Sequence, residues 1–162
     1  MIVHIGADHL GYEMARAVQT WLTDSGNEVI WHGADEFDEG DDFPLYSIRV
    51  SQAVVDSEDK GADCKGLIFG GFGSGEVITA NKVSGARAVA GFSEDYVRHS
   101  REHGNTTVLV IGAQLQNLDA TKKLIEVFFQ TEYSAEIDDT RRILHATEYE
   151  NSGTIEGWLI ER

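Results

Sequence analysis

The residues best suited to chemistry lie in a glycine-rich segment, GLIFGGFGSGEVITANK at positions 66–82. A short apolar run enters a loop with four glycines in residues 70–75, and the loop ends on one carboxylate, Glu76. Glycines leave backbone N–H groups open to a ligand, and a loop that leads into a helix N-terminus favours an anion or a developing oxyanion. The segment therefore combines a candidate oxyanion hole with a candidate base.

Glu76 has two interpretations that residue type alone leaves open. As an acid in the first turn of a helix it would complement the helix dipole, which is worth about 0.3–1 kcal/mol. As a general base it would point into a ligand crevice beside the glycine loop. The loop reads GGFGSG, which matches neither the GxGxxG of a dinucleotide turn nor the GxxxxGK[ST] of a P-loop. Nucleotide binding by this loop is therefore excluded.

Two other segments carry groups that can move protons near neutral pH, Asp8-His9 and Arg101-Glu102-His103. His103 falls near the end of a helical pattern, where its cation could equally offset the helix dipole. We assign structural roles to the remaining histidines, which are His4, His32, His99 and His145. Because no HExxH or other regular ligand spacing is present, we expect no metal ion.

Short apolar runs alternate with segments of helical periodicity almost from end to end. This alternation predicts an α/β fold of a single domain, a three-layer αβα sandwich around a five-stranded parallel sheet in the flavodoxin-like or Rossmann-like order 2-1-3-4-5. The expected strands are Ile2–Ile5, Glu28–His32, Gly66–Phe69, Arg87–Phe92 and Val108–Ile111. The first expected helix ends at Gly26, and the others cover approximately 46–55, 76–83, 94–103 and 118–129.

Ligands of such sheets bind beyond the carboxyl ends of the strands, where the strand order reverses. In the expected order this point lies between the first and third strands. It brings the segment Gly6–His9 and the glycine loop to the same crevice.

The end of the chain departs from the alternating pattern. A further helical stretch, 135–149, has no strand after it, and we expect it to pack across the surface or onto a second subunit. We assign residues 1–150 to the αβα domain and residues 151–162 to a C-terminal tail. Trp158 and Leu159 in this tail are candidate contact residues.

Composition excludes several classes of protein. The formal net charge of −15 repels polyanions, so we expect no nucleic-acid partner. No apolar stretch approaches the roughly 20 residues that span a bilayer, so we expect no membrane partner. The single cysteine, Cys64, cannot form an internal disulfide, and the N-terminus shows no leader pattern, which together predict a cytoplasmic protein.

The acidic run DEFDEGDD, residues 35–42, lacks a calcium-loop pattern, and we interpret it as a solvated, mobile connection.

Several motifs together resemble one family. The segments MIVHIGADHLGYE, DDFPLY, GLIFGGFGSGEVITANKVSGARA and REHGNTTVLVIGA resemble type B ribose-5-phosphate isomerases, a family that includes the galactose-6-phosphate isomerase subunits. The resemblance covers roughly residues 1–145. The Gly-Ser-Gly-Glu form of the loop is similar to a branch, known from actinobacteria, in which a glutamate is the base where other members use a cysteine at the start of the loop.

The resemblance implies an aldose-ketose isomerase that needs no cofactor and acts on a pentose phosphate or related sugar, of the ribose 5-phosphate to ribulose 5-phosphate type. It implies a homodimer or a dimer of dimers with shared active sites. His103 and Asp8 would open the sugar ring, and Glu76 would move a proton between C1 and C2 through a cis-enediolate. The implied substrate-binding set is His9, Gly71, Phe72, Gly73, Ser74, Gly75, Gly104 and Arg142, in which the N–H groups of Gly71, Gly73 and Gly75 would hold the enediolate oxygen.

Four positions depart from the family pattern. Phe72 lies where the family has Ser or Thr, and Gly104 lies where it has Asn. Gln114 and Asp138 replace arginines that commonly bind the sugar phosphate, which leaves Arg142 and its neighbour Arg141. A carboxylate 4 Å from a phosphate charge costs about 4 kcal/mol at an effective dielectric near 20. The alternative is therefore a noncatalytic or altered-specificity homologue that binds an unphosphorylated sugar.

Overall fold

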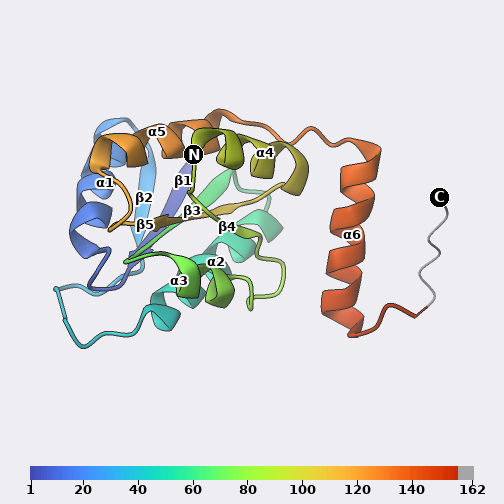
Figure 1. Ribbon diagram of the computed structural model, residues 1–162, viewed down its shortest axis with the longest axis horizontal. Helices are drawn as coiled ribbons and strands as arrows, with labels where there is room; N and C mark the ends of the chain where they lie inside the picture. The colour runs from blue at the N-terminus through green and yellow to red at the C-terminus, as the bar shows by residue number, and fades with distance from the viewer. Residues whose placement is uncertain (157–162) are drawn as a thin grey trace.

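The computed structural model describes residues 1–156, which form a five-stranded parallel sheet with helices on both faces (Figure 1). The elements in chain order are β1 (Ile2–Ala7), α1 (Tyr12–Asp24), β2 (Glu28–Trp31), α2 (Phe43–Asp59), β3 (Cys64–Gly70), α3 (Ser74–Ala80), β4 (Ala88–Ala90), α4 (Glu94–Gly104), β5 (Val108–Gly112), α5 (Leu118–Gln130) and α6 (Ile137–Ser152). The expected αβα class and all five expected strands are confirmed.

The order of the last two strands differs from the prediction of 2-1-3-4-5. The observed order is β2-β1-β3-β5-β4, so β5 pairs with β3 and β4 lies at the edge. Burial explains the exchange. Every residue of β5 is buried, as suits a strand covered on both faces, whereas β4 has three residues of which only Val89 is buried. The shorter, less buried strand takes the edge.

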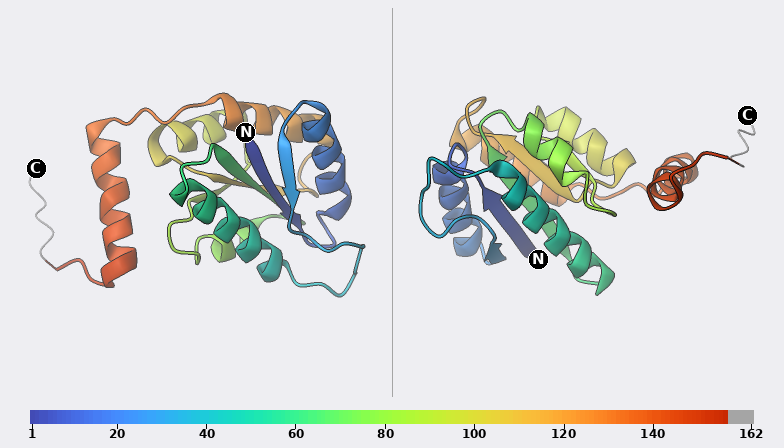
Figure 2. Two further views of the ribbon diagram at one scale, coloured as in Figure 1. Left: turned by 180° about the vertical axis from the view of Figure 1, so that it is seen from behind. Right: turned by 90° about the horizontal axis from the view of Figure 1, so that it is seen from below.

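Strand order determines which face each helix covers, because parallel crossovers are right-handed. Helices α1, α4 and α5 pack together on one face, and α2 and α3 pack together on the other (Figure 2). Two apolar clusters fill the two sides of the sheet, one around Phe69 and Phe128 and the other around Val50 and Ile68. Since α1 and α3 lie on opposite faces, the strand order reverses between β1 and β3, as predicted.

Local sequence explains where several helices begin. Pro44 occupies the first turn of α2, where its fixed φ suits a helix and its missing N–H costs nothing. Ser93 accepts a hydrogen bond from the Tyr96 N–H at the start of α4, and Asn117 accepts one from the Ala120 N–H at the start of α5.

Helix α6 stands apart from the sandwich and contacts mainly α4 (Figure 1). None of its residues is buried, and its apolar Ile137, Leu144 and Tyr149 are exposed. The helical stretch predicted over 135–149 is thus confirmed as α6. The domain boundary at residue 150 stays a prediction, and Trp158 and Leu159 lie outside the described residues. Within residues 1–156, no helix is both long enough and apolar enough to cross a membrane.

Two histidines, His4 buried and His32 partly buried, form a pair between β1, β2 and α2. The Nδ1 atom of His4 lies 3.0 Å from Nε2 of His32, and its Nε2 atom lies 3.0 Å from Oγ of Ser57. Burial lowers the pKa of His4, and burial together with His4 and Arg49 lowers the pKa of His32 to about 4. The pair is therefore neutral at pH 7 and structural, as expected for these histidines.

This pair predicts acid sensitivity. Between about pH 6.5 and pH 4 the unfolded chain binds protons that the folded chain does not, so the free energy of unfolding falls as pH falls through this window. Urea unfolding at a series of pH values measures this slope. His32→Gln should flatten it, and a slope that His32→Gln leaves unchanged would show that the pair is not its source.

Candidate active site

The Glu76 carboxylate lies against the backbone of Gly70, where β3 ends. Helix α3 begins at Ser74, which places Glu76 in its first turn with its side chain turned inward and only 5% exposed. A Cβ atom on residue 70 would overlap Oε1 of Glu76. Glycine at position 70 is therefore required by the side chain of residue 76, a relation that the sequence pattern did not reveal.

A second buried carboxyl group, that of Asp8, lies at the same end of the strands. Asp8 follows β1, is 5% exposed and accepts a hydrogen bond of 3.0 Å from the Gly11 N–H. Burial raises the pKa of Glu76, and the charge of Asp8 raises it further. Burial also raises the pKa of Asp8, against the effect of Gly11. A carboxyl group with a raised pKa is a stronger base at neutral pH than an ordinary one.

The glycine loop turns its carbonyl groups away and leaves N–H groups at the start of α3. The O atoms of Gly70 and Gly71 accept hydrogen bonds from residues 113 and 114, at 2.8 and 3.0 Å. Gly73 has a φ of +85°, a left-handed conformation that favours glycine. The N–H groups of residues 73–75 open the helix, where no intrahelical acceptor exists for them. Loop and helix thus provide donors beside Glu76.

The loop carries two exposed side chains and packs against one aromatic ring. Phe72 is 64% exposed, and Ser74 is exposed as well. The ring of Phe43, from the DDFPLY motif, covers Gly75, where an added Cβ would lie 2.6 Å from Cζ of the ring. The predicted residues Gly71, Phe72, Gly73, Ser74 and Gly75 therefore belong to one loop, and Phe43 packs against its Gly75.

His9 is bound to a residue of the acidic segment. Oδ1 of Asp41 lies 2.7 Å from Nδ1 of His9 and accepts a second hydrogen bond of 2.9 Å from the His9 backbone N–H. This bond is the main cause of a raised His9 pKa. The interpretation of residues 35–42 as a solvated connection is wrong for Asp41, whose side chain is 6% exposed. Residues 35–40 are exposed, as that interpretation expects.

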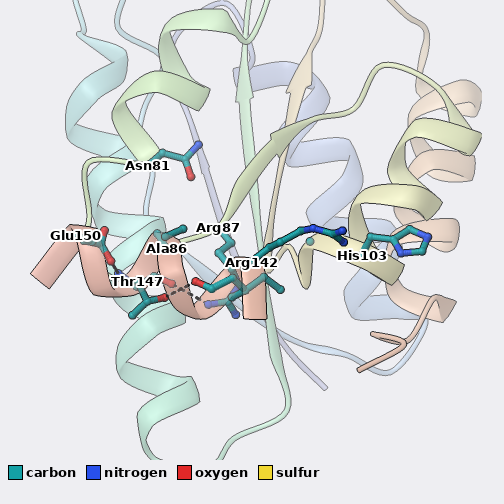
Figure 3. A pocket seen from close by; sticks show the side chains of 11 residues that line it. Asn81, Ala86, Arg87, His103, Arg142, Thr147 and Glu150 are labelled. Atoms are coloured by element: carbon teal, nitrogen blue, oxygen red, sulfur yellow. Dashed lines mark hydrogen bonds between the residues drawn. The ribbon is translucent and has the colours of Figure 1, made fainter. Parts of the chain in front are cut away.

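His103 and Arg142 form a separate group that joins α4 to α6. Nδ1 of His103 lies 2.7 Å from Oδ2 of Asp139, and Oδ1 of Asp139 accepts a hydrogen bond of 2.8 Å from Arg142. Arg142 is also 3.9 Å from Asp138, which binds Arg141 at 2.6 Å. A pocket of about 440 Å³ lies beside them, between α6 and the sandwich (Figure 3). Its lining includes His103, Gly104, Arg142, Arg87 and Glu150.

The predicted residues thus fall into two groups at opposite ends of the parallel strands. Asp8 and Glu76 follow the ends of β1 and β3, whereas His103 precedes the start of β5. The strands run in parallel, and β5 has five residues at roughly 3.3 Å each, so the sheet separates the two groups. Within one chain the structure unites Asp8, His9 and Glu76 with the glycine loop, but not with His103, Gly104 and Arg142.

Two contributors to these groups were not predicted, Asp41 and Asp139. Each holds the Nδ1 atom of a candidate histidine at 2.7 Å. Asp41 was visible only as one acid among many, and Asp139 only as a helix residue. Among the residues that the structure describes, no group of three or more His, Cys, Asp or Glu is arranged to hold a metal ion.

Comparison with known proteins identifies the family. Residues 3–145 match the family model described as Ribose/Galactose Isomerase, which is most of the chain. The chain belongs to the ribose/galactose isomerase family.

Relatives within this family are similar over nearly the whole chain. Ribose-5-phosphate isomerase B of Mycobacterium leprae is 35% identical over 94% of this chain and 91% of its own length. The Escherichia coli protein of the same name is 33% identical over 81% of this chain and 85% of its own length. The structure of the Clostridium thermocellum ribose-5-phosphate isomerase B superposes with a TM-score of 0.86 at 29% identity, over 95% of this chain and 100% of that one.

Gly70→Ala tests whether this member of the isomerase family depends on the contact between Gly70 and Glu76. The added methyl group should push the carboxylate out of its buried place and lower the pKa of Glu76 toward its ordinary value, because burial is the main cause of the raised pKa. Carbon-13 NMR of the glutamate carboxyl groups measures the change. Gly40→Ala, at an exposed position with ordinary contacts, is the control. An unchanged Glu76 titration in Gly70→Ala would contradict the assignment.

Proposed function

We propose that this protein is an aldose-ketose isomerase that acts on a pentose phosphate of the ribose 5-phosphate type, with Glu76 as the base. Family membership supports the reaction class, and the similar proteins named ribose-5-phosphate isomerase B support the substrate class. The protein needs no cofactor for this reaction, because only protons move between carbon and oxygen atoms. A single buried cysteine, Cys64, is compatible with a cytoplasmic enzyme.

One observation carries the assignment of the base. Relatives outside the glutamate branch use a cysteine at the start of the glycine loop, and the residue there in this chain is Gly70. The Glu76 carboxylate occupies the space that a side chain at position 70 would take. Glu76 is thus positioned to replace the missing base from six residues further along the chain, with its pKa raised by burial.

The proposed reaction has two stages. First, the ring opens: the proton on the O1 hydroxyl is removed while the ring oxygen gains one, with His103 and Asp8 as the acid–base pair. Glu76 then removes the C2 proton of the open aldose, and the electron pair moves into a cis-enediolate. A proton passes from O2 to O1, and protonation at C1 by Glu76 then gives the ketose, with its carbonyl group at C2. N–H groups of Gly71, Gly73 and Gly75 hold the oxygen that carries the charge, where each donor is worth about 2.7–4 kcal/mol.

A second copy of the chain completes the site in this proposal. His103 and Glu76 lie at opposite ends of the strands of one sheet, so both can touch one sugar only if they come from different chains. Helix α6 has no buried residue and exposes Ile137, Leu144 and Tyr149, which supports a partner on this surface. A homodimer with two shared sites is the smallest assembly that satisfies this constraint. The acid–base pair for ring opening would then combine His103 of one chain with Asp8 of the other.

The second candidate is a homologue with altered specificity that binds an unphosphorylated sugar. Arg142, the remaining family arginine, is held by Asp139 at 2.8 Å and lies 3.9 Å from Asp138. Arg141 is likewise paired with Asp138. A phosphate dianion would have to compete with these carboxylates for both guanidinium groups. This arrangement favours a substrate with less negative charge at its far end.

Proton exchange in D2O tests the proposed base. Ribose 5-phosphate incubated with the protein should gain deuterium at C2 and yield ketose product, and Glu76→Gln should lower both by about 10²-fold or more, because an amide cannot accept the proton. Proton NMR follows both signals. Glu126→Gln, on a distant exposed face of α5, is the charge-matched control. Exchange that persists in Glu76→Gln would reject this residue as the base.

The same assay separates the two candidate functions when ribose and other unphosphorylated aldoses are included. Faster turnover of the free sugars would favour altered specificity, and no exchange with any sugar would favour a noncatalytic role.

Mixing two inactive variants tests the shared site. Glu76→Gln and His103→Asn should each be inactive, but a heterodimer of the two has one site with both native residues. Random reassortment into two-fold dimers leaves about one quarter of all sites intact. Denaturing and refolding the two variants together should therefore restore about one quarter of the native activity. No recovery in a mixture with proven heterodimers would contradict a shared site.

A further inference from the structure

We propose that Asp41 is a positioning residue that holds His9 with its Nε2–H directed at the sugar, so that His9 acts as a charged hydrogen-bond donor to a substrate oxygen. This inference rests on the proposed isomerase function. It assigns a role to the one residue of the acidic segment whose side chain is buried.

The geometry of the contact fixes the imidazole at two points. One carboxylate oxygen of Asp41 accepts hydrogen bonds from the backbone N–H of His9 at 2.9 Å and from its ring Nδ1–H at 2.7 Å. A ring held at Nδ1 by a carboxylate has its second nitrogen, Nε2, available for a ligand. The His9 side chain is 27% exposed, against 6% for that of Asp41, so the imidazole is the more accessible partner of the pair.

The acidic segment is built to hold this carboxylate in place. The Arg16 guanidinium stacks on the Trp31 ring at 3.8 Å and donates to the carbonyl oxygens of Ala34 and Asp35. The Trp31 indole N–H donates to the same Ala34 oxygen at 2.9 Å. Helix α1 and strand β2 thereby anchor the N-terminal end of the segment.

At its other end the segment runs directly into α2 after Asp42. The Asp41 backbone N–H donates to the Asp38 oxygen at 3.2 Å. Asp41 also raises the pKa of the buried Tyr46 hydroxyl, for which burial is the larger cause. The segment therefore lies between two fixed ends, and Asp41 occupies its anchored, buried end.

The charges around His9 all favour its protonated form. Asp41 and Asp8 are the groups that act on it, and both raise the pKa of His9. No lysine or arginine appears among the described groups that shift it. Glu76 and Tyr46 are the next ionisable groups, through their contacts with Asp8 and Asp41 respectively. A carboxylate at hydrogen-bond distance stabilises imidazolium, which donates more strongly than neutral imidazole.

Nitrogen-15 NMR of histidine-labelled protein tests the inference without any substrate. In the native protein the pKa of His9 should lie above its ordinary value of 6.5. The neutral ring that forms above this pKa should keep its one proton on Nδ1, toward the Asp41 carboxylate. Asp41→Asn should lower this pKa by about one unit, since an opposite charge at this range shifts a pKa by 1–3 units. A native His9 that titrates at or below 6.5 would overturn the inference.

Activity provides the second readout. If imidazolium is the working form, kcat/KM falls as pH rises through the His9 pKa, which gives the pH profile an alkaline limb. Asp41→Asn should move this limb to lower pH by about one unit. Asp41→Glu, which restores the charge, should return the limb toward its native position. Glu39→Gln removes an exposed charge from the same segment and should leave the profile unchanged. A purely structural role would lower activity at every pH and leave the limb in place.

The two readouts separate this inference from the proposed function. If the native protein isomerises no sugar, the proposed function fails while the NMR titration still decides whether Asp41 charges His9. If the native protein is active but Asp41→Asn shifts neither the titration nor the limb, the proposed function stands and the role of Asp41 is wrong.

Discussion

The contact between the Glu76 carboxylate and the bare backbone of Gly70 is the constraint on which the rest of the site depends. A carboxyl group can remain buried here because no side chain at position 70 competes for the space. Burial removes water from the carboxylate and raises its pKa, and the neighbouring Asp8 adds to this effect. The left-handed Gly73 and the short helix α3 then turn the chain so that residue 76 returns over residue 70.

The parallel sheet imposes the second constraint. In a parallel sheet, a group that follows a strand and a group that precedes a strand lie at opposite ends of the strands, and no side chain spans that distance. Asp8, His9 and Glu76 lie at the carboxyl ends of the strands, and His103 lies at the amino ends. Helix α6, which carries Asp139 and Arg142, contacts mainly α4 and buries none of its own residues. In the proposed homodimer, a second copy would both cover α6 and bring the two groups together.

The sequence predicted those features that short-range patterns control. Fully apolar strands such as VLVIG and the helical periodicity of 118–129 identified the elements, and turn glycines identified the loop. The order of β4 and β5 was missed because pairing between strands is a long-range property. The smaller side chains and short length of AVA, against VLVIG, are the signal that could have placed β4 at the edge.

The sequence indicated candidate residue types for the site but not the contacts that support them. Asp8, His9 and Glu76 follow strands, and the resemblance to known motifs drew attention to them. Asp41 could not be separated from five other acids nearby, because only the folded chain shows which carboxylate is buried against His9. Asp139 was missed for the same reason, since its partner His103 is 36 residues away. Polar pairs across such separations have no periodic signature.

The most direct test of the central claim is a crystal structure of the protein with a hydroxamate that mimics the cis-enediolate of the open sugar. The account predicts that the atoms corresponding to C1 and C2 lie about 3–3.5 Å from a Glu76 carboxylate oxygen, the range of a near-attack geometry. It also predicts that the imidazole facing the other end of the ligand belongs to His103 of the second chain. A ligand bound away from Glu76, for example in the pocket beside α6 of a single chain, would contradict the account.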